Sequence, residues 1–241
     1  GETEDWDFRD EKHSPAGLTP EDEAEDGYHG TVISGIIGGS DHLPDRFKHW
    51  VIGISPGCRI IPLRINLNPA KTLGQMIKLF GGRDRYHNRF DAINMVTDLA
   101  SKNPEKRYII NCSWKTSGSS KSVHEAIKAA ADQPNVLIVC AAGNANDNLD
   151  KKPLYPAGYP EVMAVAATDL DDHKWHIGAR MGSNFGGCVS VCAPGKDVFS
   201  TSGQNGYTDT VDPPDGTSYA TPFVAGLAGL VWSVNKQFHI L

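Results

Sequence analysis

The chain contains several continuous apolar runs, and these limit its fold more than any other feature. Asn135–Ala141 is the clearest, because almost every residue in it is Val, Leu, Ile, Cys or Ala rather than every second one. Continuous runs of this length are typical of strands that are buried on both faces of a parallel sheet. Similar runs occur at Val51–Ile54, Arg59–Ile65, Arg107–Ser113, Glu161–Ala167 and Cys188–Ala193.

Helical patterns alternate with these runs, at His29–Ile37, Phe90–Lys102, Ser122–Asp132 and Thr217–Lys236. Alternating strands and helices predict an α/β fold, with a mainly parallel sheet and helices on both faces. The first and last helices are rich in Gly, Ala, Ile and Val, so we expect them to lie in the core. The 241 residues suit one large domain, and no composition shift marks a boundary.

Charge and hydropathy exclude two classes of partner. No apolar run approaches about 20 residues, which predicts no membrane-spanning helix. The net charge of −6 comes from residues 1–26, which hold 11 acidic and 2 basic residues. The remainder is nearly neutral, so the sequence gives no electrostatic reason to expect nucleic-acid binding.

Five cysteines leave at least one thiol unpaired within the chain. Cys112, Cys140 and Cys192 lie within strand-like runs, where we expect small buried thiols. There is no CxxC pair of the kind that binds zinc. Buried free thiols favour a reducing, intracellular compartment, with secretion as the alternative.

Gly216–Gly226 reads GTSYATPFVAG and predicts a helix that begins with a hydroxyl at Ser218. The N-terminus of a helix exposes free N–H groups and a positive potential, which suit an anion or a developing oxyanion. We expect Pro222 in the first turn, where its missing N–H costs little. The alternative is an ordinary N-cap serine.

Two further polar residues stand at element ends. His29 precedes a helix of small residues in HGTVISG, and Asn144 follows a buried strand in AAGN. A carboxamide at the carboxyl end of a parallel strand faces the usual ligand crevice, where its NH2 could donate to an oxyanion. Each motif alone is weak: a structural histidine and a turn-forming asparagine remain open.

Together, HGT-x-x-x-G, AAGN and GTS-x-ATP-x-VAG in this order resemble the subtilisin-like serine proteases (subtilases). The resemblance runs from Trp6 to Phe238. Val51–Pro56, Ile109–Trp114 and Gly182–Gly186 are similar to further family segments, and Trp6–Asp10 is most similar to kexin-type members. The resemblance implies a three-layer subtilisin-like fold and a serine endopeptidase that hydrolyses peptide bonds.

The resemblance also implies a role for each site residue. Ser218 would be the nucleophile and His29 the base that takes its proton. The Asn144 side chain and the Ser218 N–H would form the oxyanion hole. An extended substrate would pair with the backbone of Ser113, Trp114 and Lys115. The P1 pocket would be walled by Ala141, Ala142 and Gly143, which indicates no strong preference for a basic P1 residue.

The catalytic Asp of the family normally ends a buried strand some thirty residues before the His. Nothing before His29 resembles that strand, and Asp5, Asp7 and Asp10 are poor candidates. We therefore expect residues 1–241 to be a single subtilase domain that lacks the Asp strand and part of the C-terminal region. The alternative is a catalytically dead subtilase fold used for binding or regulation.

The implied chemistry requires no cofactor. Family members often hold structural calcium, for which the acidic Glu21–Asp26 and the carbonyls of Ala157–Val162 are candidates; a solvated acidic loop is the alternative, and no residue is assigned as a metal ligand. The implied partners are a polypeptide substrate and an inhibitory pro-segment or other domains of a longer protein. A nucleotide-binding α/β enzyme is excluded because no strand is followed by GxGxxG.

Overall fold

The computed structural model describes residues 6–7, 12–13, 29–39, 51–65, 87–202, 206–207 and 214–235. Four parallel strands form its main sheet in the order β4-β5-β6-β9. Their bounds are Tyr108–Cys112 (β4), Val136–Ala141 (β5), Met163–Thr168 (β6) and Val189–Pro194 (β9). Every residue of β5 is buried, as its continuous apolar run predicts.

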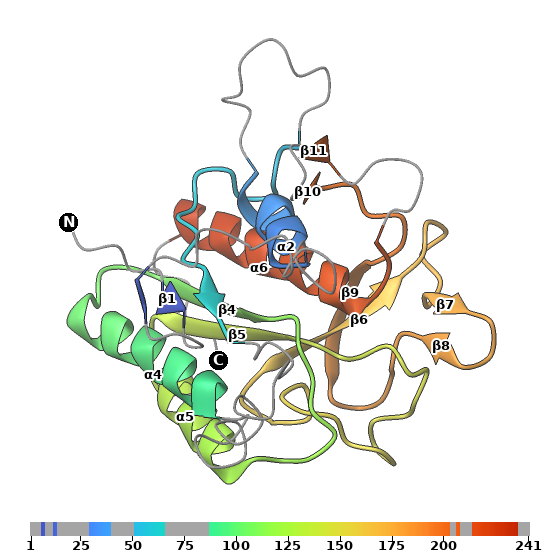
Figure 1. The fold of residues 1–241 in the computed structure, drawn as a ribbon, viewed down its shortest axis with the longest axis horizontal. Coiled ribbons are helices and arrows are strands. Elements are labelled where there is room, and N and C mark those ends of the chain that lie inside the picture. The colour runs from blue at the N-terminus through green and yellow to red at the C-terminus, as the bar shows by residue number, and fades with distance from the viewer. Residues whose placement is uncertain are drawn as a thin grey trace, which may run out of the picture.

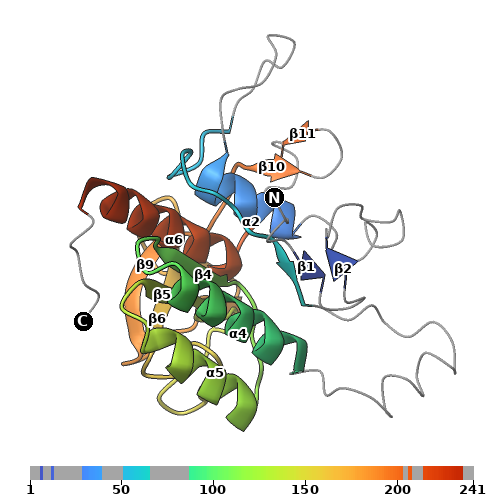
Figure 2. The ribbon, with the colours of Figure 1, turned by 90° about the vertical axis from the view of Figure 1, so that its left-hand side faces the viewer.

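Helices cover both faces of this sheet, so the fold has three layers (Figure 1, Figure 2). On one face, α4 (His87–Lys102) and α5 (Lys121–Ala131) pack against β4 and β5. On the other face, α6 (Thr217–Val234) crosses all four strands, and α2 (His29–Gly38) packs on α6. The predicted α/β architecture with helices on both faces is confirmed.

One predicted strand is wrong. Residues 51–54 form no strand, because their backbone is bonded to the end of α2 instead. The N–H of Gly53 donates to the carbonyl of Gly39, and the N–H of Ile54 donates to that of Ile36, at 2.8 and 3.0 Å. Of residues 59–65, only β3 (Leu63–Arg64) is a strand.

Short strands flank the main sheet. β1 (Trp6–Asp7) pairs with β3 in parallel and with β2 (Lys12–His13) antiparallel. β7 (His176–Ile177) pairs with β8 (Met181–Gly182), and β10 (Thr201–Ser202) pairs with β11 (Gly206–Tyr207). Among the described helices, none combines the length and hydropathy needed to cross a membrane.

The expectation that the last helix lies in the core holds for one face along its length, since Trp232 near its end is 4% exposed and belongs to the core. Thr217, Ala220 and Thr221 are buried against the sheet. In the second half, apolar side chains face solvent on successive turns, at Leu227, Leu230, Val231 and Val234. α6 is therefore buried at its start, where it carries the site residues, and has one buried and one exposed face beyond them.

The five cysteines form no disulfide in the described structure. Cys112 and Cys140 are buried and lie opposite each other in the register of β4 and β5. The expectation of a buried Cys192 is wrong, since this thiol is exposed. Its strand, β9, is one of the two edge strands of this four-stranded sheet, and Val191 beside it is also exposed.

Candidate active site

Ser218 is the second residue of α6 and is half-buried. The helix begins after Gly216, whose φ of 129° is a conformation that side-chain-bearing residues rarely adopt. A Cβ at position 216 would also lie only 2.6 Å from Nδ2 of Asn144. Glycine at this position therefore allows the start of the helix to approach the asparagine closely.

Pro222 lies past the first turn of α6, so its predicted place is wrong. Within a helix a proline removes the N–H that would donate to the carbonyl four residues earlier. Here that carbonyl belongs to Ser218, and the hydroxyl of Ser113 donates to it at 2.7 Å. Asn111 Nδ2 donates to the same hydroxyl at 3.0 Å. The end of β4 thus supplies the hydrogen bond that the proline takes from the helix.

Asn144 follows β5 and is joined to the start of α6 through Thr217. Its Oδ1 accepts hydrogen bonds from the N–H of Thr217 at 3.0 Å and from the Thr217 hydroxyl at 2.7 Å. The same hydroxyl accepts from the N–H of Gly143 at 3.0 Å. Because Oδ1 is held in this way, the Nδ2 donor of Asn144 is directed away from Thr217, toward the Gly216 side.

His29 begins α2 and is brought to the start of α6 by Tyr219. The two rings meet edge to face, with their centroids 5.5 Å apart. The residues on either side of Ser218 therefore contact the other two predicted catalytic residues: Thr217 contacts Asn144, and Tyr219 contacts His29. Three motifs that are far apart in the sequence meet at one helix N-terminus.

The predicted substrate-binding strand adjoins the same point. The Ser218 hydroxyl lies 3.4 Å from the carbonyl oxygen of Ser113 and donates to it. Trp114 is half-buried under the guanidinium of Arg89, 4.8 Å from its ring centroid, whereas Lys115 is exposed. Beyond them, Thr116 pairs antiparallel with Tyr155 through two backbone hydrogen bonds of 2.7 and 3.0 Å.

The predicted pocket wall is buried and held by its backbone. Ala142 is fully buried, and its carbonyl accepts from Asn184 Nδ2 at 2.9 Å. The carbonyl of Gly143 accepts from the N–H of Asn184 at 2.8 Å. Sequence reasoning assigned no role to Thr217 or Asn184, although both lie within motifs that carry the resemblance. Their only signal is a polar side chain in an otherwise small or apolar segment.

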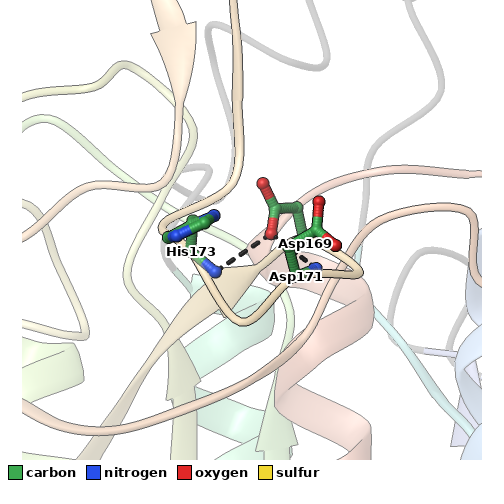
Figure 3. Close-up of side chains that lie close together, drawn as sticks. All are labelled: Asp169, Asp171 and His173. Carbon is green, nitrogen blue, oxygen red and sulfur yellow. Dashed lines mark hydrogen bonds between the residues drawn. The ribbon is translucent and has the colours of Figure 1, made fainter.

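Asp169, Asp171 and His173 form a cluster of metal-ligand types between β6 and β7 (Figure 3). Asp169 Oδ1 accepts from the backbone N–H groups of Asp171 and His173, both at 3.0 Å. Desolvation raises the pKa of Asp169, but these N–H groups, together with the nearby charges of His173 and Lys196, hold the pKa below its ordinary value. The cluster is explained as a capped turn.

Other predicted features lie outside the described residues, namely Asp5, Asp10 and the acidic stretch 21–26. For Asp7 the structure describes the backbone pairing alone. Residues 157–162 are described, and Ala157 and Tyr159 among them are buried beside β5 in the core.

The sequence is similar to those of known proteins over most of its length. Fervidolysin from Fervidobacterium pennivorans is 29% identical over 247 residues, covering 92% of this chain and 32% of that protein. Thermitase from Thermoactinomyces vulgaris is 28% identical over 232 residues, covering 96% and 68%. The chain thus spans about a third of fervidolysin and about two thirds of thermitase.

Among solved structures, a cold adapted subtilisin-like serine proteinase superposes with a TM-score of 0.68 at 25% identity. The superposition covers 95% of this chain and 67% of that one. The sequence model of the subtilase family (peptidase S8) matches residues 2–239. With nearly its whole length matched and the fold shared, the chain belongs to the subtilase family.

Proposed function

We propose that this chain carries serine endopeptidase activity, with Ser218 as nucleophile, His29 as general base and Asn144 as oxyanion donor. One observation supports this assignment above others: the two neighbours of Ser218 contact the other two residues, through the Thr217–Asn144 hydrogen bonds and the Tyr219–His29 ring contact. An N-cap serine needs no such partners. A structural histidine and a turn asparagine would have no reason to meet at one helix N-terminus.

The proposed reaction transfers an acyl group twice. The Ser218 oxygen attacks the peptide carbonyl carbon while His29 takes the hydroxyl proton. The C–N bond then breaks, and His29 gives that proton to the departing amine. Water repeats the sequence on the acyl-enzyme, releasing the carboxylic acid and restoring the serine. These steps use side chains, backbone and water, so the proposed chemistry requires no cofactor.

The negative charge on the carbonyl oxygen has two proposed donors. Asn144 Nδ2 is one, because its oxygen is already held by Thr217. The N–H of Ser218 is the other, since the first N–H groups of a helix lack intrahelical acceptors. Loss of one such donor lowers kcat about 10²- to 10³-fold in subtilisin, and we take that size of effect as the expectation.

The proposed substrate is a polypeptide in extended form. Its backbone would pair beside Ser113, Trp114 and Lys115, next to the Ser218 hydroxyl. The P1 side chain would meet Ala141, Ala142 and Gly143, which carry no charge, with Leu154 close to Gly143. An uncharged wall offers nothing to pair with Lys or Arg, so we expect no strong basic P1 preference.

The remaining features stay predictions. They are the acid that orients His29, a pro-segment or further domains as partners, structural calcium at 21–26 or 157–162, the cellular location, and a single domain over residues 1–241. The alternative is a catalytically dead subtilase fold used for binding or regulation. It would be supported if a folded chain failed to show specific labelling of Ser218 in the following experiment.

The test uses a serine-directed fluorophosphonate probe on the folded full chain. We expect covalent labelling of Ser218, identified by mass spectrometry, and its loss in Ser218→Ala. Ser233→Ala is the matched control, because Ser233 lies on the same helix, is exposed and bonds only locally to Leu230. A folded wild-type chain whose Ser218 is labelled no faster than Ser233 would contradict the proposal.

A further inference from the structure

Asn184 lies beside the predicted oxyanion donor yet belongs to neither the strand nor the helix that carries the site. It follows β8 in the segment Ser183–Asn184–Phe185, and only 1% of its surface is exposed. This segment runs parallel to the loop after β5, with bridges from Ala145 to Gly182 and from Asn148 to Phe185. Asn184 therefore faces the loop that contains Asn144.

Four hydrogen bonds from Asn184 hold that loop on both sides of Asn144. Before Asn144, the backbone N–H of Asn184 donates to the carbonyl of Gly143 at 2.8 Å, and its Nδ2 donates to the carbonyl of Ala142 at 2.9 Å. After it, Oδ1 accepts from the N–H groups of Ala145 and Asp147, at 3.0 and 2.9 Å. Two N–H donors at Oδ1 and one carbonyl at Nδ2 fix the orientation of the carboxamide.

These contacts leave Asn144 little freedom. Its side-chain oxygen is bonded to Thr217, and its backbone carbonyl accepts from Gly182 at 3.2 Å. The backbone on either side is fixed by Asn184. The glycine at 143 serves the same contact, because a Cβ there would lie 2.7 Å from Asn184 Nδ2. The position of Asn144 Nδ2 thus depends on a side chain forty residues later.

We propose that Asn184 is a positioning residue for catalysis, which holds the Asn144 amide where the oxyanion develops. This inference rests on the proposed function. A catalytic donor must be held within about 0.5 Å of its productive place, and a displacement of about 1 Å costs up to about 100-fold in rate. Replacing Asn184 lets the loop relax and moves Nδ2, although Asn184 itself touches no substrate.

A merely structural asparagine provides the matched control. Asn135 is 3% exposed, and its Nδ2 donates to the carbonyls of Ala100, Asn103 and Lys106. It holds a loop with comparable bonds at the opposite end of β5 from Asn144. Both Asn→Ala changes should therefore lower the stability of the fold, while only Asn184→Ala should affect catalysis.

The experiment compares wild type, Asn184→Ala and Asn135→Ala as full chains. We expect fluorophosphonate labelling of Ser218 to be about 10- to 100-fold slower in Asn184→Ala and within about twofold of wild type in Asn135→Ala. With a peptide substrate, kcat should fall by the same factor, and KM should stay within about threefold. Equal labelling rates in the two variants would overturn the inference and leave the proposed function standing.

Hydrogen exchange separates this inference from the proposed function. In Asn184→Ala, the amides of Ala145 and Asp147 should lose protection, because their acceptor is gone. This readout needs no catalysis, so it tests whether Asn184 holds the loop around Asn144 even if the wild-type chain proves unreactive. Retained protection at both amides would also overturn the inference.

A second variant covers the case in which Asn184→Ala does not fold. Asn184→Asp keeps the size and both acceptor contacts but replaces the donor to Ala142 with an oxygen. We expect a folded protein with protection at Ala145 and Asp147 and labelling slowed at least about fivefold. Labelling at the wild-type rate would count against the inference.

Discussion

The hydroxyl of Ser113 donates a hydrogen bond of 2.7 Å to the backbone carbonyl of Ser218, which lies 105 residues later in the chain. In an uninterrupted helix this carbonyl would accept from the N–H at position 222, where Pro222 has none. This hydrogen bond joins the end of β4 to the start of α6 at the proposed nucleophile. The arrangement also explains why a proline is tolerated inside α6.

We predict that Ser113→Ala lowers the free energy of unfolding by about 1–3 kcal/mol, because it leaves a carbonyl oxygen without a donor. In a Pro222→Ala background, the new N–H at 222 can donate to Ser218 instead, so the same change should cost less than about 0.5 kcal/mol. Urea denaturation of wild type, Ser113→Ala, Pro222→Ala and the double variant measures the cost of Ser113→Ala in both backgrounds. Ser233→Ala, on the exposed face of α6, is the control, and equal costs in both backgrounds would argue against the explanation.

Gly143→Ala should be strongly destabilising. Its φ of 99° disfavours any side chain, and the added Cβ would lie 2.5 Å from Leu154 Cδ2 and 2.7 Å from Asn184 Nδ2. We expect a loss of more than about 2 kcal/mol, from strain and from the displaced loop. Gly118→Ala is the control, since its Cβ would meet nothing within 4 Å. Similar unfolding midpoints for the two variants would contradict the prediction.

The pH dependence of stability should carry a contribution from Cys140. Burial, and then the neighbouring Cys112 thiol, raise the pKa of Cys140 well above its ordinary value. Below the unfolded-state pKa of about 8.5, this contribution to stability is fully present. It is lost as the pH rises further, by up to about 1.4 kcal/mol per pH unit, because only the unfolded chain ionises there.

Unfolding free energies measured between pH 7.5 and 10 test this contribution. The decline should be shallower in Cys140→Ala than in wild type. Cys192→Ala, which removes an exposed thiol, should follow the wild-type slope. A Cys140→Ala protein that declines as steeply as wild type would show that the buried thiol makes no such contribution.

Alkylation should separate the thiols by exposure. In the folded protein we expect iodoacetamide to modify Cys192 first, and Cys58 and Cys188 more slowly, because burial raises the pKa of the latter two. Cys112 and Cys140 should react only on unfolding. Peptide mass spectrometry over time gives the order, and early modification of Cys112 would be inconsistent with the buried β4–β5 register.

The sequence predicted the main sheet and its helices because continuous apolar runs and helical periodicity reflect burial directly. It failed where a tertiary partner decides the outcome. Residues 51–54 have strand-like composition, but their N–H groups find acceptors at the end of α2. Cys192 has core-like neighbours, yet its strand lies at the edge of the sheet.

The candidate site divides in the same way. His29, Asn144 and Ser218 stand in motifs of specific composition, so the sequence could single them out. Thr217 and Asn184 act through hydrogen bonds to backbone and side chains 73 and about 40 residues away, which no local pattern records. The sequence predicts Pro222 in the first turn, because only there does a missing N–H cost little. It does not reveal that the Ser113 hydroxyl donates to the Ser218 carbonyl in place of that N–H.

The hydrogen bonds between Thr217 and Asn144 join segments that are 73 residues apart. Closing so long a loop costs conformational entropy, which only the packing of the sheet and helices offsets. The proposed nucleophile and its proposed oxyanion donor therefore lie together only where β5 and α6 pack against each other. The proposed peptide-bond cleavage therefore depends on tertiary structure, because the unfolded chain does not hold these residues together.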